Sequence, residues 1–425
     1  MSLLPVLRSL TVGPTTERFV VRVLFTTLGS PSHGRAQLPL ARAFAAAGHD
    51  VHVATTPPLV PVFEQDGIRV TACVGEFSPR AFITPELLEQ ASRLHPDSEA
   101  PQDTLGRVMP LAMSGPMARN LLERILPVAR EFRPDLILRD GMDLSSCLIA
   151  ELLGVPQLPT PSGAGNVVDP AEILPGLNAV RRERGLPAQD DPLSIIPHGR
   201  IDYVPAAFSF ARYLPPSWSY RQAAAVDHWP VLPQWIVRLP TDRPLVFAAL
   251  GTALPMIRQQ AAAADEREQS PISLPDPVLV LRSMIEAARR LQECAVVVAT
   301  SGLPADTDGL PPHVHITDRV PQPLLLESVD VFLTHGGFNS VRESLRTATP
   351  MAVLPQFGDQ FANARRVQEL GLGREVVDTT ADGIAATVRE TLTDASIQAR
   401  VREARLAMLG LPEIDTAVTD LENIT

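Results

Sequence analysis

Lysine is absent from this 425-residue chain, in which all 37 basic residues are arginine. Without a lysine amine, the chain cannot build the phosphate site of a P-loop NTPase, the ATP site of a protein kinase or the Schiff base of a pyridoxal enzyme. Acidic residues outnumber basic ones and give a net charge of -11, with no basic run. We therefore expect no nucleic-acid partner.

Cysteine is almost as scarce. Cys73, Cys147 and Cys294 are odd in number and far apart. They form no CxxC motif, so the sequence predicts neither a disulfide framework nor a zinc site, and it fits a reducing cytoplasm, where we expect the protein to be located.

Long apolar runs are also missing. No run reaches the roughly 18 residues of a membrane span. Residues 1–19 are interrupted by Pro5 and make a poor signal peptide. We expect an N-terminal extension here and no stable membrane insertion.

Short apolar runs that end in Gly, Ser or Thr alternate with helical patterns along the whole chain. The predicted strands of the first half are 20–27, 50–55, 68–74, 135–140 and 155–159, and those of the second half are 244–252, 294–300, 313–317, 329–335 and 351–355. Such alternation predicts the α/β class, with two doubly wound, Rossmann-like parallel sheets. We expect domains over 20–213 and 244–425, a proline-rich linker over 214–243, and a last helix that is a candidate to pack back on the first domain.

Two polar residues follow predicted strands of the first sheet, where ligands bind in open α/β folds. His33 lies in a loop before a helix that we expect to begin near Ala36, and the helix dipole would lower its pKa and keep the ring neutral as a base. Asp140 follows the strand DLILR, and Asp143 is the better N-cap for the next helix. Asp140 is therefore left to orient His33. A solvated loop histidine and an N-cap are the structural alternatives.

The stretch VDVFLTHGGFNSVRESL is the strongest motif in the chain. A strand ends at His335, two glycines allow close approach of the backbone, and a helix begins near Asn339 and Ser340. A helix N-terminus of this kind binds a diphosphate. Ser340 and Glu343 also have the spacing of a capping box, which is a purely structural alternative.

Acidic residues occur in two further loops. Asp359 and Gln360 follow the strand MAVLP as a carboxylate and an amide suited to sugar hydroxyls, or simply start a helix. Asp306 and Asp308 form a D-x-D tripeptide, but they lie in a polar loop and not at a strand end. We interpret this tripeptide as a solvated turn and predict no metal.

With these motifs, the sequence resembles family 1 glycosyltransferases with the GT-B fold, in particular bacterial enzymes that glycosylate antibiotics and other natural products. The resemblance rests on residues 319–373, the strand RPDLILRD, the LGT loop ending at Thr252 and the His33 loop. Ala36 stands where many members have proline, and Arg319 stands where plant members stack the base on tryptophan.

The resemblance implies a role for each candidate residue. His33 would be the general base and Asp140 its orienting partner. The diphosphate would be held by Thr252, His335, Gly337, Asn339 and Ser340. The ribose and base would be bound by Ser301, Arg319, Val320, Gln322 and Glu343, and the sugar by Asp359 and Gln360.

The implied reaction is inverting transfer of a sugar from dTDP or UDP to a hydroxyl of an apolar acceptor, with no metal or other cofactor. The acceptor would lie against residues 77–125, which contain Phe82, Met109, Met113 and Met117. Two other functions remain alternatives: a non-catalytic nucleotide-sugar-binding accessory protein and a nucleotide-sugar epimerase. The protein is also a candidate homodimer. The polar insert after Thr252 favours a mobile loop.

Overall fold

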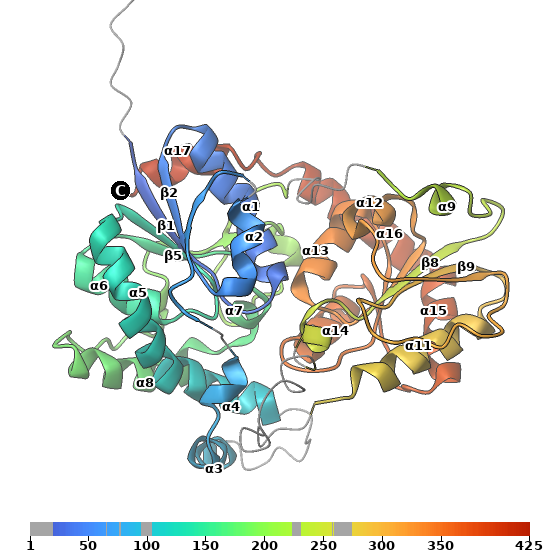
Figure 1. Cartoon of the computed structure of the whole chain (residues 1–425), viewed down its shortest axis with the longest axis horizontal. Helices are drawn as coiled ribbons and strands as arrows, with labels where there is room; N and C mark the ends of the chain where they lie inside the picture. The colour runs from blue at the N-terminus through green and yellow to red at the C-terminus, as the bar shows by residue number, and fades with distance from the viewer. Residues whose placement is uncertain are drawn as a thin grey trace, which may run out of the picture.

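The protein contains two parallel sheets side by side, each flanked by helices (Figure 1). The structure, a computed structural model, describes residues 20–64, 66–75, 78–94, 104–222, 231–256, 258 and 274–425. The predicted extension over 1–19 and most of the insert after Thr252 lie outside these residues.

The first sheet has five strands in the order β3-β2-β1-β4-β5. Its strands are β1 (Arg22–Thr26), β2 (Asp50–Ala54), β3 (Arg69–Thr71), β4 (Leu136–Arg139) and β5 (Gln157–Pro159). All pairings are parallel. Leu24 faces one apolar cluster and Val23 and Phe25 face the other, so β1 is covered on both sides, as its continuous apolar run predicts.

The second sheet has six parallel strands in the order β10-β9-β8-β11-β12-β13. Its strands are β8 (Leu245–Ala249), β9 (Ala295–Ala299), β10 (Val314–Thr317), β11 (Val331–Thr334), β12 (Met351–Val353) and β13 (Gly373–Glu375). The first five were predicted, and β13 was missed. A two-stranded pair, β6 (Ile201–Asp202) and β7 (Trp218–Ser219), lies between the sheets in sequence.

Helices connect the strands of both sheets. The first half contains α1 (Pro31–Ala46), α2 (Val60–Glu64), α3 (Pro85–Leu94), α4 (Thr104–Ala112), a π-helical turn (Met113–Met117), α5 (Ala118–Phe132), α6 (Ser145–Leu153), α7 (Gly163–Val167) and α8 (Pro170–Glu183). The second half contains α9 (Gln234–Val237), α11 (Pro277–Arg290), α12 (Gln322–Leu325), α13 (Phe338–Thr347), α14 (Gln360–Glu369), α15 (Ala381–Thr393), α16 (Ala395–Leu409) and α17 (Thr416–Glu422). Short 3-10 turns lie at Pro57–Leu59, Pro79–Phe82, Pro192–Ile195, Ala206–Phe208 and Leu326–Ser328. Across the described residues, no helix combines the length and the apolar character needed to span a bilayer.

The first helix begins earlier than predicted. α1 starts at Pro31, not near Ala36, so His33 belongs to its first turn and not to the preceding loop. The proline explains the difference, because its fixed φ suits the first helical position and its missing N–H is not needed there. The helix ends where expected, before Gly48, whose φ of +89° is left-handed.

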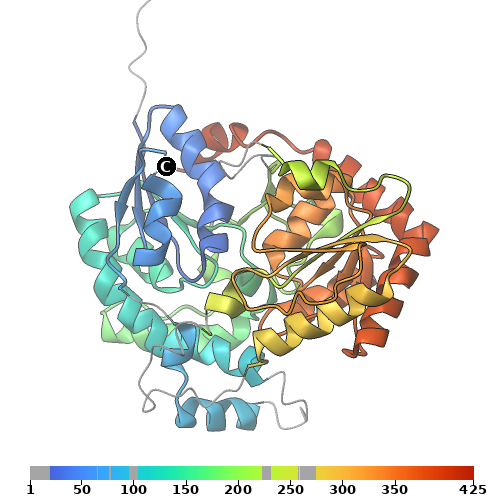
Figure 2. The ribbon, with the colours of Figure 1, turned by 45° about the vertical axis from the view of Figure 1, so that its right-hand side comes forward.

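The end of the chain returns to the first domain. Figure 2 shows α17 beside α1, on the far side of the molecule from α15. Ala417, Val418 and Leu421 join the apolar cluster that covers β1. The hydroxyl of Tyr220 donates a hydrogen bond to Asp420 at 2.9 Å, which ties α17 to the segment after β7.

Both sheets have a point where the strand order reverses. In the first sheet it lies between β1 and β4, and in the second between β8 and β11. Connections leave such neighbouring strands in opposite directions and open a crevice at their carboxyl ends. The loops after β1, β4, β8 and β11 are therefore the places where a site is expected.

The packing of α17 can be tested by Leu421→Ala. Leu421 is fully buried, so this change should lower the free energy of unfolding by about 2–5 kcal/mol through lost burial and a residual cavity. The matched control is Leu406→Ala on α16, where the side chain is 70% exposed and the change should cost less than about 0.5 kcal/mol. Urea denaturation followed by fluorescence measures both, and equal midpoints for the two variants would contradict the packing of α17.

Candidate active site

A cleft of about 1020 Å³ lies between the two sheets and is lined by residues of both. It contains every predicted donor residue together with His33. Asp140 does not line the cleft, because it lies behind the His33 ring. The structure therefore brings together all the candidate residues that lie far apart in the sequence.

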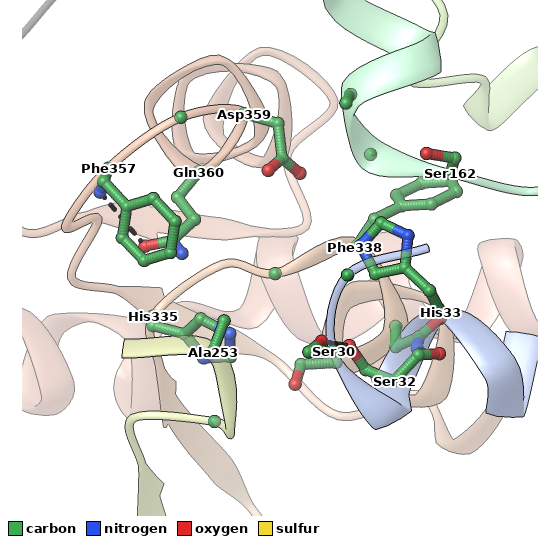
Figure 3. A pocket seen from close by; sticks show the side chains of 18 of the residues that line it. Ser30, Ser32, His33, Ser162, Ala253, His335, Phe338, Phe357, Asp359 and Gln360 are labelled. Atoms are coloured by element: carbon green, nitrogen blue, oxygen red, sulfur yellow. Dashed lines mark hydrogen bonds between the residues drawn. The ribbon is translucent and has the colours of Figure 1, made fainter. Parts of the chain in front are cut away.

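His33 and Asp140 form a hydrogen-bonded pair at the switch point of the first sheet. His33 Nδ1 donates to Asp140 Oδ2 at 2.7 Å. Asp140 is only 2% exposed, and the backbone N–H of Met142 donates to its other oxygen at 2.8 Å, so the carboxylate is held in place. Because Nδ1 carries the proton, Nε2 of the neutral ring keeps its lone pair. The side chain is 25% exposed, at the cleft wall (Figure 3).

The pKa of His33 is raised, whereas the sequence argument predicted that the helix dipole would lower it. Burial alone would lower this pKa, but the attraction and hydrogen bond of Asp140, with a smaller attraction from Asp359, outweigh burial. Arg342 opposes the increase. The carboxylate 2.7 Å away, which the expectation from the helix dipole left out, makes His33 a stronger base.

The loop after β11 leads into α13 at the switch point of the second sheet. Gly337 is the N-cap, and no side chain caps the helix there. The capping-box interpretation of Ser340 and Glu343 is therefore wrong, since Ser340 lies inside the first turn. The amides of that turn have no carbonyl within the helix to bind, so they are available to an anion.

His335 lies under this loop with its ring wedged between two glycines. A Cβ on Gly251 would lie 2.4 Å from the ring, and a Cβ on Gly337 would also lie 2.4 Å from it. Burial lowers the pKa of His335 to about 4, so the ring is neutral and offers a hydrogen bond and no charge.

A polar cluster forms the next part of the cleft. The Gln322 amide donates to Glu343 at 2.7 Å and to Ser340 at 3.2 Å, so the residues predicted for the ribose and base contact one another. Ser301 has a left-handed φ of 54°, which is uncommon outside glycine. Arg319 is 72% exposed at the rim of the cleft.

Asp359 and Gln360 have different environments. The Asp359 carboxylate accepts a hydrogen bond from Asn363 at 2.8 Å, and burial raises its pKa. The Gln360 carbonyl oxygen is already used, since it accepts from the backbone N–H of Gln356 and of Phe357 (Figure 3). The Gln360 amide nitrogen is the group left to meet a sugar hydroxyl.

Asn339 connects the two domains. Its side-chain amide donates to the backbone carbonyl of Ser32, in the first turn of α1. Its oxygen accepts from Arg342. The predicted diphosphate role of Asn339 is therefore left to its backbone N–H, because its carboxamide already bridges the domains.

The other end of the cleft is apolar. Met109, Met113 and Met142 line it, and Met113 begins the π-helical turn, a feature that is frequent at functional sites. Met117 was expected here but is fully buried in the core, and Phe82 packs against the core without lining the cleft. Within the expected segment, Phe77 and residues 95–103 lie outside the described residues.

The D-x-D tripeptide lies away from the cleft lining. Asp306 accepts a hydrogen bond from the backbone N–H of Asp308 at 3.0 Å in an exposed turn.

Three residues in or beside the cleft were not predicted from the sequence: Ser162 and Gly163, which line it, and Arg342, which lies behind its lining. Ser162 and Gly163 follow β5, so the rule that sites lie after strands would have found them. Among the described residues, the buried Ser162 hydroxyl has no hydrogen-bond partner. A Cβ on Gly163 would lie 1.9 Å from Asp359 Oδ2, so only glycine leaves room for that carboxylate. Nothing in the sequence marks Arg342.

Comparisons with known proteins agree with this geometry. L-demethylnoviosyl transferase of Streptomyces niveus is 28% identical over 85% of this chain and 86% of its own length. Aclacinomycin-T 2-deoxy-L-fucose transferase of Streptomyces galilaeus is 24% identical over 95% of this chain and 96% of its own. The solved structure of spinosyn rhamnosyltransferase SpnG has a TM-score of 0.71 at 23% identity and covers 95% of this chain and 100% of its own. The predicted GT-B fold is confirmed.

Two domain families match in the same order as the two sheets. Residues 42–214 match the N-terminal domain of erythromycin biosynthesis protein CIII-like proteins, and residues 282–424 match the C-terminal domain. Together these two matches cover most of the chain, which therefore belongs to the erythromycin biosynthesis protein CIII-like glycosyltransferases of the GT-B fold.

Proposed function

We propose that this glycosyltransferase moves a sugar from a dTDP- or UDP-sugar to a hydroxyl of an apolar natural-product acceptor, with inversion at the anomeric carbon. The observation that carries the proposal is the His33–Asp140 hydrogen bond of 2.7 Å, which places a base at the cleft wall shared with the N-terminus of α13. The SpnG structure with thymidine diphosphate supports the choice of dTDP first.

The chemistry follows from these positions. His33 Nε2 takes the proton of the acceptor hydroxyl while the oxygen attacks the anomeric carbon, and Asp140 stabilises the imidazolium that forms. The bond between the anomeric carbon and the diphosphate oxygen breaks on the opposite face, so the configuration inverts.

The leaving diphosphate takes up negative charge as the bond breaks. The first-turn amides of α13 are placed to stabilise this charge without a metal ion, and the neutral ring of His335 lies beneath them. Ser340 helps to hold the diphosphate, Gln322 and Glu343 bind the ribose side of the nucleotide, and Arg319 stacks over the base at the rim.

The acceptor occupies the methionine-lined end of the cleft. Thioether side chains adapt to irregular apolar surfaces, which suits a bulky aglycone. The structure of SpnG with its spinosyn aglycone supports an acceptor of this class. We further propose that the enzyme is soluble and cytoplasmic, with domains over 20–213 and 244–425 and a linker over 214–243.

Nucleotide binding is the first prediction to test. At millimolar concentration and with EDTA present, dTDP or UDP should raise the melting temperature, while ADP and GDP should not. A ligand at 100 times its Kd stabilises the folded state by about 2.7 kcal/mol. If no nucleotide raises the melting temperature, the diphosphate site is wrong. Sugar conversion without any acceptor would instead indicate an epimerase.

The base assignment predicts a specific pH dependence. A raised pKa means that His33 keeps its proton to higher pH, so kcat/KM should fall as pH decreases through a value above the ordinary 6.5. Asp140→Asn removes the main attraction on the His33 proton. The acidic limb of its pH profile, where kcat/KM falls as pH decreases, should therefore move to lower pH, and the maximal kcat/KM should decrease. His33→Ala should lower kcat at least about 100-fold and leave nucleotide binding intact. An acidic limb that stays in place in Asp140→Asn would refute the pairing.

Gly163 gives a test of the sugar contact. Gly163→Ala introduces a Cβ where Asp359 now lies, so the carboxylate must move. We expect kcat/KM for the sugar donor to fall about 10- to 100-fold, as a displacement near 1 Å does in other active sites, with dTDP affinity unchanged. Gly165→Ala in the same helix is less suitable because its Cβ would lie 3.2 Å from the backbone of Gly141. The control is Gly410→Ala, because Gly410 has a φ of -80° and its Cβ would meet no atom closer than 3.4 Å. Equal kinetics for Gly163→Ala and wild type would remove Asp359 from the sugar site.

A further inference from the structure

Arg342 is a buried cation that forms no salt bridge among the residues that the structure describes, although the charges of Asp202 and Glu343 act on it from a distance. It is 1% exposed, on the face of α13 that packs against the first domain. Among the residues that the structure describes, its Nε and Nη1 have no hydrogen-bond partner and no carboxylate lies within 4 Å of the guanidinium. An unpaired buried charge is costly, so its retention calls for a function.

The guanidinium contacts groups that join the two domains. Its remaining nitrogen, Nη2, donates to the Asn339 side chain. Its Cζ lies 5.0 Å from the centre of the Tyr203 ring and 5.3 Å from the centre of the Phe338 ring, which are cation–π distances.

Two of these contacts continue to the helix that carries His33. The Asn339 amide donates to the Ser32 carbonyl, and the Tyr203 hydroxyl donates to the Ala36 carbonyl at 2.9 Å. Ser32 and Ala36 lie one turn apart on α1, on either side of His33 in sequence. α13 and α1 are thus joined twice, and Arg342 contacts both connections.

We propose that Arg342 is a positioning residue that fixes the base helix α1 against the donor helix α13 through Asn339 and Tyr203. The expected loss of activity rests on the proposed function, because Arg342 would then set the distance between the base His33 and the diphosphate loop. The structural part of the inference, the coupling of α1 to α13, stands without that function.

The charge of Arg342 has a second effect on the same base. His33 faces Asp140 and Asp359, which favour its protonated form, and Arg342, which opposes that form. Arginine keeps its charge even where burial lowers its pKa. Arg342 therefore keeps the pKa of His33 lower than the two carboxylates alone would set it.

The test compares three variants of the full chain. Arg342→Met removes the charge and the donors, Arg342→Lys keeps the charge without the planar fork, and Tyr203→Phe removes only the hydroxyl that reaches Ala36. The control is Arg346→Met on the same helix, where the guanidinium pairs with Glu327 and not with the interface. Hydrogen exchange, dTDP affinity and the pH dependence of transfer are measured for each.

For Arg342→Met we expect kcat to fall about 10- to 100-fold with dTDP affinity within threefold of wild type, because the donor site itself is intact. Amides at the start of α1 should exchange faster without any ligand, and the acidic limb should move to higher pH. Arg342→Lys should restore the position of the limb but not all of kcat. Tyr203→Phe should speed exchange in α1 without moving the limb.

The result that overturns the proposal is exchange in α1 that matches Arg346→Met, whatever the activity. An acidic limb that stays in place in Arg342→Met also overturns it. If Arg342→Met does not fold, Arg342→Lys and Tyr203→Phe decide by exchange in α1. The exchange measurement uses no substrate. It therefore tests the coupling of α1 to α13 even if the proposed base chemistry of His33 proves wrong.

Discussion

The site depends on parallel strand pairing at two places, β1 with β4 and β8 with β11. Each pairing lies where the strand order of its sheet reverses, and each opens a crevice at the carboxyl ends of the strands. The pairing of β1 with β4 brings His33 and Asp140 together across 107 positions in sequence. The pairing of β8 with β11 brings the LGT loop against His335. Acid–base and anion-binding groups therefore come from separate domains and meet only across the cleft.

Much of this was predictable because strand-to-helix loops are visible in a single sequence. The strands, the two doubly wound sheets and the loops that line the cleft follow from apolar runs that break into Gly, Ser and Thr, whereas the GT-B fold and the residue roles came from the family resemblance. His33 and Asp140 could be paired because each follows such a run. The start of α1 was also accessible, since Pro31 marks a first helical position. The prediction that the helix begins near Ala36 did not use this proline, and it therefore placed His33 in a loop.

The remaining errors come from contacts that only the folded chain creates. The sign of the His33 pKa shift depends on a carboxylate 2.7 Å away, and no local rule weighs that against a helix dipole. Asn339 and Gln360 have the side chains that sugar and phosphate sites use. The Asn339 amide is occupied by a tertiary partner, the Ser32 carbonyl, and the Gln360 oxygen is occupied by backbone amides of the loop just before it. Arg342 and Gly163 act through the opposite domain. A residue whose role is defined by the other half of the molecule leaves no periodic or motif signal in its own segment.

The return of α17 to the first domain constrains how the cleft can open. The chain crosses between the domains once before β8 and once after α16, and α17 is held at the second crossing by Leu421 and by Asp420. Two crossings define a hinge line. A rotation about that line would open the cleft, and the second crossing would oppose free swinging about a single tether. Substrates would then enter, and products leave, at the edge of the cleft opposite this hinge line.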